Sequence, residues 1–252
     1  MPTFLMALAL CLFRKKGRKE QEEIGMDEIE LTILMPCLNE EKTIGGCIEE
    51  AQQYIANAGI KAEILIADNG STDASVTIAG KLGAVVMKVA DKGYGNALRG
   101  GIKVARGKYI IMGDCDASYD FLHLEEFIRL LRAGNELVMG NRFKGGIAAG
   151  AMPPSHQYFG VPLLSLAGRL RYHTRVGDFH CGIRGFDREA ILRLGLHCEG
   201  MEFATELIGA AAQSGYRIAE IPVPLRCDGR NGKSHLHSVR DGLRHLKFII
   251  FG

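Results

Sequence analysis

The chain has 252 residues, enough for one large α/β domain with a full hydrophobic core or for two small domains. Its 31 Lys and Arg residues against 29 Asp and Glu residues give a formal net charge of +2, so charge gives no reason to expect a nucleic-acid partner. The seven cysteines are scattered, odd in number and without a Cys-x-x-Cys pair, which argues against a disulfide framework and a structural zinc site, and for a reducing compartment.

Residues 1–30 are predicted to be a flexible extension that is first basic and then acidic. The apolar run at residues 4–13 is too short to span a bilayer, which needs about 20 residues. The basic cluster follows the apolar run, whereas a secretory signal places its charges before it. Two interpretations stay open, a frayed terminus and a weak interfacial anchor on anionic lipid.

Short apolar runs alternate with segments of helical spacing in the first half of the chain. Strands are expected at residues 31–36, 63–68, 84–89, 108–112 and 136–139, and helices after residues 39–41 and at residues 93–106 and 121–132. This alternation predicts an α/β fold with a mainly parallel sheet that is flanked by helices.

The pattern changes after residue 144. We expect a mobile Gly/Pro-rich loop at 145–154, a helix at 158–172, an α-rich half with segments 185–194 and 203–214, a strand at 216–223 and a basic loop at 226–234. These segments would build a wall and a lid over the first half. The catalytic domain would then run from residue 31 to 235.

Residues 236–252 are predicted to form an amphipathic C-terminal helix. Leu243, Leu246 and Ile250 fall on one helical face, and Arg240 and Lys247 fall elsewhere. Such a helix either lies on a membrane surface or packs on the domain.

Two carboxylates follow the apolar strand at residues 109–112. Asp114 and Asp116 would stand at the carboxyl end of that strand, where ligands of open α/β sheets bind. Mg²⁺ typically takes one or two carboxylates together with ligand phosphates. The alternative is a polar loop in which Asp120 caps the next helix.

The other polar residues after strands favour the ligand site. Glu40, Asp68 and Asn69 follow early strands and suit ribose hydroxyls or a base edge, and Arg142 follows a later strand and suits a phosphate. Together with a metal at the central pair, they would stabilise a departing nucleoside diphosphate electrostatically.

Several segments resemble a known enzyme family. Residues 36–40 (Pro-Cys-Leu-Asn-Glu), 67–73, 91–98 and 113–121 resemble the GT-A glycosyltransferases of family two, in particular the polyprenyl- (dolichyl-) phosphate sugar synthases. Further segments resemble a bacterial branch of that group: residues 140–143, 150–153, 178–186, 201–206 and 228–246. The resemblance implies a GT-A-type nucleotide-binding fold and transfer of a sugar, with inversion, from a nucleotide-sugar to a polyprenyl phosphate with Mg²⁺ or Mn²⁺.

The resemblance also implies roles for individual residues. It implies donor-site positions at Pro36, Glu40, Asp68, Asn69, Asp114, Cys115, Asp116 and Arg142, with Asp116 as the metal ligand and Asp114 beside it. It implies a late loop closing on the diphosphate with Arg230, Ser234 and His235. Asp178 is a candidate base, and Arg184, interpreted as an exposed helix-flanking arginine, could hold the acceptor phosphate. Cys115 stands where many relatives have alanine, and His235 where eukaryotic relatives have lysine.

Several alternatives remain open from sequence. The donor could be GDP-mannose, UDP-glucose or UDP-N-acetylglucosamine, the acceptor could be a soluble alcohol, and the chain could be a non-catalytic sugar-nucleotide-binding subunit. A nicotinamide-dependent oxidoreductase is a weaker alternative, because Gly93-Tyr-Gly95 opens a helix but Leu98 stands at the third glycine position. Membrane-anchored relatives continue into transmembrane helices, whereas this sequence ends at Gly252. We therefore expect a cytoplasmic protein that is attached peripherally to the inner face of the cell membrane.

Overall fold

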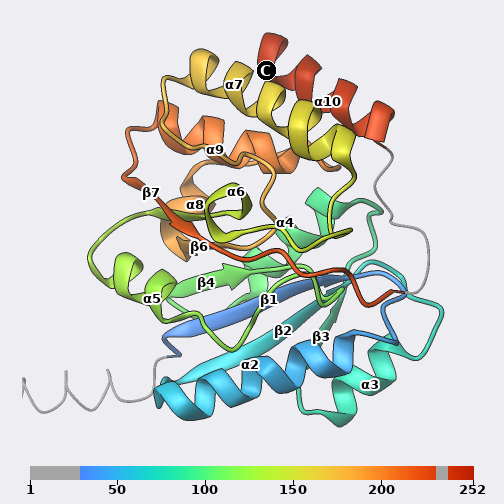
Figure 1. Ribbon diagram of the computed structural model, residues 1–252. Helices are drawn as coiled ribbons and strands as arrows, with labels where there is room; N and C mark the ends of the chain where they lie inside the picture. The colour runs from blue at the N-terminus through green and yellow to red at the C-terminus, as the bar shows by residue number, and fades with distance from the viewer. Residues whose placement is uncertain (1–28, 231–237) are drawn as a thin grey trace, which may run out of the picture.

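The computed structural model describes residues 29–230 and 238–252. The N-terminal extension before residue 29, together with Ser234 and His235, lies outside the described residues. A seven-stranded sheet runs through the centre in the order β3-β2-β1-β4-β6-β5-β7 (Figure 1). Its strands are β1 Leu31–Cys37, β2 Ala62–Asp68, β3 Val85–Lys88, β4 Tyr109–Met112, β5 Leu137–Asn141, β6 Arg184–Asp187 and β7 Ile218–Pro222.

The sheet is mainly parallel, as predicted, and β6 is the antiparallel exception. β6 pairs antiparallel with both β4 and β5, with Phe186 opposite Ile110 on one side and Leu137 on the other. The prediction that residues 185–194 belong to an α-rich half was wrong for residues 185–187, which lie in β6. The strand was missed because it has four residues, contains Gly185 and has charged residues at both ends, so it lacks a recognisable strand pattern.

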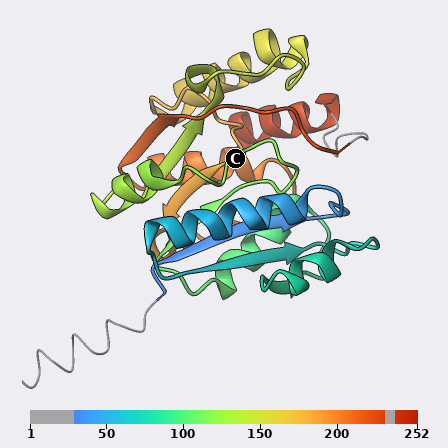
Figure 2. The same cartoon turned by 60° about the horizontal axis from the view of Figure 1, so that its bottom comes forward.

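Helices cover both faces of the sheet (Figures 1 and 2). They are α2 Ile44–Ala58, α3 Ser75–Lys81, α4 Tyr94–Val104, α5 Glu125–Arg132, α6 Arg142–Gly145, α7 Val161–Tyr172, α8 Arg188–Arg193, α9 Phe203–Gln213 and α10 Ser238–Phe251, with a π-helical turn at His156–Gly160 before α7. Helices α2, α3 and α5 pack on one face, and α4, α8 and α9 on the other.

Side-chain alternation along the strands creates these two cores. Ile33 packs with the α2 side and Leu34 with the α4 side, and both are fully buried. Because strand side chains alternate between faces, a strand that is covered on both sides reads as a continuous apolar run. This is why β1 and β4 were recognisable from sequence.

Helix α5 begins at Glu125, four residues later than the predicted start of that helix at residue 121. The carboxylate of Asp120 accepts a hydrogen bond from the Leu122 backbone N–H at 2.8 Å and contacts His123 Nδ1 at 3.0 Å. These local bonds hold a turn ahead of the helix, because an Asp side chain competes with helical hydrogen bonding.

Helix α10 packs on α7 and α9, farthest from the sheet (Figure 1). It buries Asp241, His245 and Ile249. Among the described residues, no helix is both long enough and apolar enough to cross a membrane.

Candidate active site

Four predicted site residues lie at the carboxyl ends of strands that run in the same direction. Glu40 follows β1, Asp68 is the last residue of β2, Asp116 follows β4, and Arg142 follows β5. Because these strands are parallel, their ends meet at one edge of the sheet, as the sequence predicted. Tertiary contacts decide what each side chain does there.

The centre of this edge is an ion-pair cluster around Arg230. Its guanidinium contacts Asp116 Oδ2 at 2.7 Å, Glu40 Oε1 at 3.0 Å and Asp228 Oδ2 at 3.4 Å. The Glu40 and Asp116 side chains are largely buried, so the contacts are only weakly screened by solvent. Two carboxylates from separate strands and the late basic loop are thereby brought together.

The loop that carries Asp116 is held by backbone contacts with the late loop. The backbone N–H of Gly229 donates to Asp116 O at 2.9 Å, and that of Arg226 donates to Ser118 O at 2.9 Å. Ala117 adopts a left-handed conformation with φ 66°. A non-glycine residue in this conformation costs about 1 kcal/mol, so the surrounding contacts impose it.

The pKa of the Glu40 carboxyl is raised by its surroundings. Burial, together with the charge of Asp116, raises its pKa to about 7, although Arg230 acts in the opposite direction. The hydroxyl of Thr43 donates to Glu40 Oε2 at 3.3 Å. Such a raised carboxyl pKa is typical of functional sites as well as of buried ion-pair networks.

Asp114 is half-buried and is bound by a tyrosine of α4. Its Oδ1 accepts a hydrogen bond from the Tyr94 hydroxyl at 3.0 Å. A Cβ atom at Gly182 would lie 2.3 Å from Asp114 Oδ2, so only glycine leaves room for this carboxylate. Burial, and then the charge of Asp116, raises the pKa of Asp114 to about 6. No local pattern in the chain indicated these roles for Tyr94 and Gly182.

The donor atoms at this edge fit a hard divalent cation. Asp116 Oδ1 accepts from the Ser118 N–H at 3.0 Å and Oδ2 contacts Arg230, so each oxygen keeps further acceptor capacity. Carboxylate oxygen suits Mg²⁺ or Mn²⁺, which complete their coordination with phosphate and water. Asp116 would be the direct ligand, with Asp114 behind it, and a cation there would compete with Arg230.

A cavity opens between the ends of β2 and β3. It has a volume of about 450 Å³, and its lining includes Asp68, Ser71, Val76, Lys88, Val89 and Lys92. A slot with apolar walls and flanking lysines suits a base and a sugar linked to phosphates. It adjoins Asp68, one of the predicted donor-site residues.

Asp68 and Asn69 shape the wall of this cavity. Asp68 accepts hydrogen bonds from the backbone N–H groups of Gly70 at 3.3 Å and Ser71 at 3.0 Å. Asn69 accepts from the N–H of Gly93 at 2.8 Å and donates to Asp91 O at 2.8 Å. Both side chains therefore fix the turn after β2 and join it to the start of α4.

Pro36 and Cys115, both predicted to line the donor site, contact each other. The Cys115 thiol donates to Pro36 O at 3.2 Å, which ties the end of β1 to the Asp114–Asp116 segment. Cys115 is 1% exposed, and a side-chain hydrogen bond with Cys37, together with burial, raises the pKa of its thiol well above the usual range. Cys115 is therefore a neutral thiol that packs in the core.

Arg142 and Asp178 form a buried bidentate ion pair. Arg142 Nε lies 2.7 Å from Asp178 Oδ2, and Nη2 lies 2.8 Å from Oδ1. Asp178 also accepts from the Arg142 backbone N–H at 3.2 Å and is fully buried. A carboxylate so fully engaged is poorly placed to accept a proton from substrate, so the geometry favours Asp178 as the residue that orients Arg142.

Arg184 does not lie where the sequence predicted. It is 1% exposed, inside β6, and donates to the backbone carbonyls of Cys181, Ala204 and Phe179 at 2.8, 2.9 and 3.1 Å. The premise of an exposed, helix-flanking arginine was wrong. A guanidinium that satisfies buried carbonyls holds the fold together and has no free face for an acceptor phosphate.

The Gly93-Tyr-Gly95 turn has a packing role. A Cβ at Gly93 would lie 2.3 Å from Glu199 O, and one at Gly95 would lie 2.3 Å from Cys198 O. The N–H of Asn96 donates to Glu199 O at 3.2 Å. The start of α4 is therefore covered by backbone carbonyls, which leaves no room for the pyrophosphate that a dinucleotide fingerprint would hold there.

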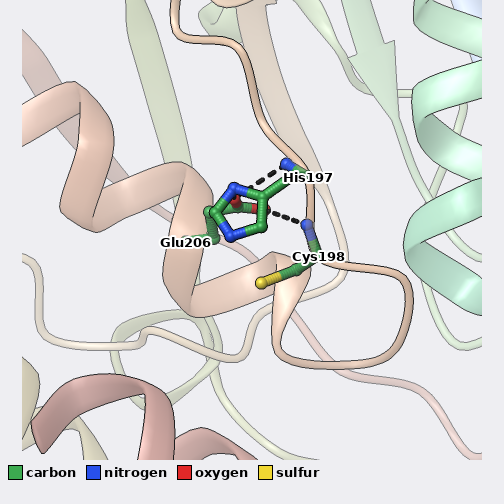
Figure 3. A group of neighbouring side chains, drawn as sticks. All are labelled: His197, Cys198 and Glu206. Atoms are coloured by element: carbon green, nitrogen blue, oxygen red, sulfur yellow. Dashed lines mark hydrogen bonds and ion pairs between the residues drawn. The ribbon is translucent and has the colours of Figure 1, made fainter. Parts of the chain in front are cut away.

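Glu206 fastens the segment that covers α4 (Figure 3). Its carboxylate accepts from the backbone N–H groups of His197 at 2.8 Å and Cys198 at 2.9 Å, and it pairs with His197 Nδ1 at 2.7 Å. Ligand atoms of His197, Cys198 and Glu206 lie within 4.8 Å of one another, so they could also approach a metal. The hydrogen bonds already account for the buried carboxylate as an anchor of this loop.

Comparison with known proteins gives one consistent family. Residues 32–195 match the family described as "Glycosyl transferase family 2". The chain is 38% identical over 221 residues to a low-salt glycan biosynthesis hexosyltransferase of Haloferax volcanii, a match that covers 87% of this chain and 53% of that protein. It therefore spans about half the length of that relative. A dolichyl-phosphate hexose transferase of the same organism is 30% identical over 221 residues, with 88% of this chain and 92% of that protein covered.

A solved structure has the same fold. Glucosyl-3-phosphoglycerate synthase from Mycobacterium tuberculosis, in complex with Mn²⁺, UDP-glucose and phosphoglyceric acid, matches with a TM-score of 0.69. The match covers 87% of this chain and 79% of that chain, at 20% sequence identity. At 20% identity, this structural similarity shows a shared fold and nothing more.

Proposed function

The chain belongs to glycosyltransferase family 2 and has the GT-A fold, and on that premise we propose that it transfers a hexose from a nucleotide-sugar to a polyprenyl phosphate with inversion at the anomeric carbon. The observation that carries the proposal is the meeting of Asp116, Glu40 and Arg230 at the edge of the sheet where β2 also ends in Asp68. Negative and positive groups there flank the place where a diphosphate would leave.

The donor would lie along the edge of the sheet. Its base and ribose would occupy the cavity next to Asp68, and its diphosphate would reach Asp116. A divalent cation held by Asp116 would supply charge neutralisation of the departing diphosphate. Arg230 would exchange its carboxylate partners for phosphate oxygens, because a guanidinium binds either group in the same planar geometry.

The acceptor would supply its own nucleophile. An oxygen of the acceptor phosphate would bond to the anomeric carbon while the bond from that carbon to the diphosphate oxygen breaks. A phosphate monoester is already anionic near neutral pH, so no side chain has to remove a proton. This agrees with the engagement of Asp178 by Arg142, which would hold Arg142 for a phosphate of donor or acceptor.

Support for a lipid acceptor comes from the relative named dolichyl-phosphate hexose transferase, which aligns over most of both chains. A soluble phosphorylated acceptor is the second candidate, because the structural relative was solved with phosphoglyceric acid. Both acceptors present a phosphate, and they differ in the group that the phosphate esterifies. A lipid acceptor would place the enzyme at a membrane surface.

The test is a transfer assay with radiolabelled donors. UDP-glucose, GDP-mannose and UDP-N-acetylglucosamine would each be incubated with the full chain, Mn²⁺ and either undecaprenyl phosphate or 3-phosphoglycerate. The proposal expects label in the organic-extractable product with one of the three donors. Label only in the aqueous product would favour the soluble acceptor, and donor binding without transfer to either would favour a non-catalytic subunit.

A further inference from the structure

Exposed apolar side chains are concentrated on two neighbouring helices. Nine of the twelve exposed large hydrophobic side chains in the described part of the chain lie on α7 with its preceding turn and on α10. They are Tyr158, Phe159, Leu163, Leu166, Leu170, Leu243, Leu246, Ile250 and Phe251. Scattered exposed hydrophobics are normal, whereas a concentration of this size marks an interaction site.

On α7 these residues form one stripe that faces away from the core. Leu163, Leu166 and Leu170 are 67%, 45% and 69% exposed and follow helical spacing. The opposite side of the helix buries Gly168 and Tyr172. The core is therefore already filled by the other face, and packing within the chain gives no reason for the leucine stripe.

Helix α10 repeats this arrangement alongside α7 (Figures 1 and 2). Its inner side buries His245 and Ile249, while Leu246 and Ile250 are 38% and 55% exposed. Arg171 Nη2 donates to the Gly252 carbonyl at 3.3 Å and joins the two helices. We call the nine exposed hydrophobic side chains of these two helices the α7–α10 surface.

The charges around this surface are positive. Arg169, Arg171, Arg175, Arg240 and Lys247 are exposed on or next to the two helices. Residues 143–177 contain no Asp or Glu, and the acidic residue of α10, Asp241, is buried. Exposed apolar side chains bordered by cations are the composition of an interfacial helix on anionic lipid.

We propose that the α7–α10 surface seats the protein on an anionic membrane, with its leucine stripe at the headgroup level and its arginines on lipid phosphates. A second copy of the chain fits the surface less well, because a symmetric pairing of this patch would bring the arginines of both copies together. The proposal rests on the proposed function for its purpose, since a lipid acceptor must be reached at a membrane.

The position of α10 ties this surface to the candidate active site. The chain leads from Arg230, in the ion-pair cluster, to the start of α10 at Ser238. On the inner side of α10, His245 stacks edge-on with His180 at 4.4 Å between ring centroids, and the backbone N–H of His180 donates to Asp178 at 3.2 Å. Seating α10 on lipid would therefore set the orientation of the site relative to the membrane.

Vesicle co-sedimentation of the full chain tests the proposal. We expect binding to phosphatidylcholine vesicles that contain phosphatidylglycerol, weaker binding to phosphatidylcholine alone, and loss of the difference at high salt. The double variants L163S/L170S and L246S/I250S should each lower the partition coefficient about tenfold or more. The control V85S/V104S removes two similarly exposed valines elsewhere and should leave binding unchanged.

The charge contribution is tested separately. The variant R169Q/R240Q/K247Q should lose about fivefold in affinity for each cation on phosphatidylglycerol vesicles and should change little on phosphatidylcholine. The matched control K42Q/K81Q/K103Q removes three exposed lysines on other helices and loops. Equal losses in both variants would mean diffuse attraction, and the α7–α10 surface would be refuted.

Activity separates the failure of this proposal from the failure of the proposed function. With a short, water-soluble prenyl phosphate and no vesicles, L163S/L170S should match the parent chain; with undecaprenyl phosphate in vesicles it should be slower. Vesicle binding without any transfer would leave the surface standing and remove the proposed function. If the chain did not bind anionic vesicles, the proposal that the α7–α10 surface binds a membrane would be refuted. A dimer that the serine variants dissociate would also refute it. Melting temperatures would show that each variant is folded.

Discussion

The guanidinium of Arg230 lies 2.7 Å from the carboxylate of Asp116, across a separation of 114 residues in the chain. The contact joins the loop after β4 to the late basic loop. Asp116 is the carboxylate that we assign to the metal, and Arg230 is the cation that now neutralises it. We propose that Asp116 exchanges Arg230 for a cation when the ligands bind, and the first two predictions test this exchange.

The first prediction concerns Asp116. The D116N variant should lose glycosyl transfer by about 10²-fold or more, because neutralising the carboxylate removes a cation ligand and the charge stabilisation that depends on it. Its melting temperature should stay within a few degrees of the parent. The control E49Q removes an exposed carboxylate of α2 and should transfer normally. Normal turnover by D116N would refute the metal assignment.

The second prediction concerns competition between Arg230 and the metal. In the R230M variant, Mn²⁺ should bind the free protein more tightly, because the ion no longer has to displace a guanidinium from Asp116. Transfer should nevertheless fall, because Arg230 is also the proposed partner of the diphosphate. Mn²⁺ titration followed by electron paramagnetic resonance measures the first effect. Weaker Mn²⁺ binding would show that Arg230 supports the metal site.

The third prediction separates a positioning role of Asp178 from a proton-transfer role. The D178N variant should be destabilised by about 3 kcal/mol or more, because it leaves the Arg142 guanidinium buried without its counter-charge. The double variant R142M/D178L should be less destabilised than the sum of its single variants. Urea unfolding measures both effects. An unchanged stability, together with loss of the fall in rate at low pH that a general base produces, would instead identify Asp178 as a base.

The fourth prediction concerns His245 beneath α10. Burial lowers the pKa of His245 to about 4, and its Nδ1 lies 2.8 Å from the Thr205 hydroxyl. The ordinary value of about 6.5 applies in the unfolded chain, so between about pH 6.5 and about pH 4 the unfolded state binds more protons. The folded state must therefore lose stability as pH falls through that window.

The variant H245N isolates this contribution, because it keeps a polar atom near Thr205 and cannot be protonated. Between about pH 7 and about pH 5, the parent chain should lose several degrees of melting temperature relative to H245N. Glu40 and Asp114 have raised pKa values and act with the opposite sign, but they are present in both proteins and cancel in the difference. Parallel curves for the two proteins would contradict the prediction.

The sequence alone was sufficient to predict features that depend on the residues of a single strand and those that directly follow it. The apolar runs of β1 and β4 and the polar residues that follow them predicted the edge at which Glu40 and Asp116 meet, because parallel strands align their carboxyl ends. The family resemblance added Arg230, whose distance along the chain carries no local signal. The expected N-terminal extension, Ser234 and His235 stay predictions.

Pairing between distant segments could not be predicted in this way. The strand character of Arg184 depends on two neighbours that it meets only in the folded sheet, and its guanidinium is taken up by carbonyls that no spacing rule identifies. The leucines of α7 look like core residues in sequence, and only the packing shows that they are exposed.

The sequence by itself determined the α/β class, the family and the edge of the sheet that holds the polar residues, because these depend on period, strand ends and short motifs. Only the tertiary structure decided that Asp178 is engaged by Arg142, that Asp114 is bound by Tyr94 and that α7 and α10 share an apolar face. Hydrogen bonds, ion pairs and burial join residues far apart in the chain, and such partners are set when the chain packs.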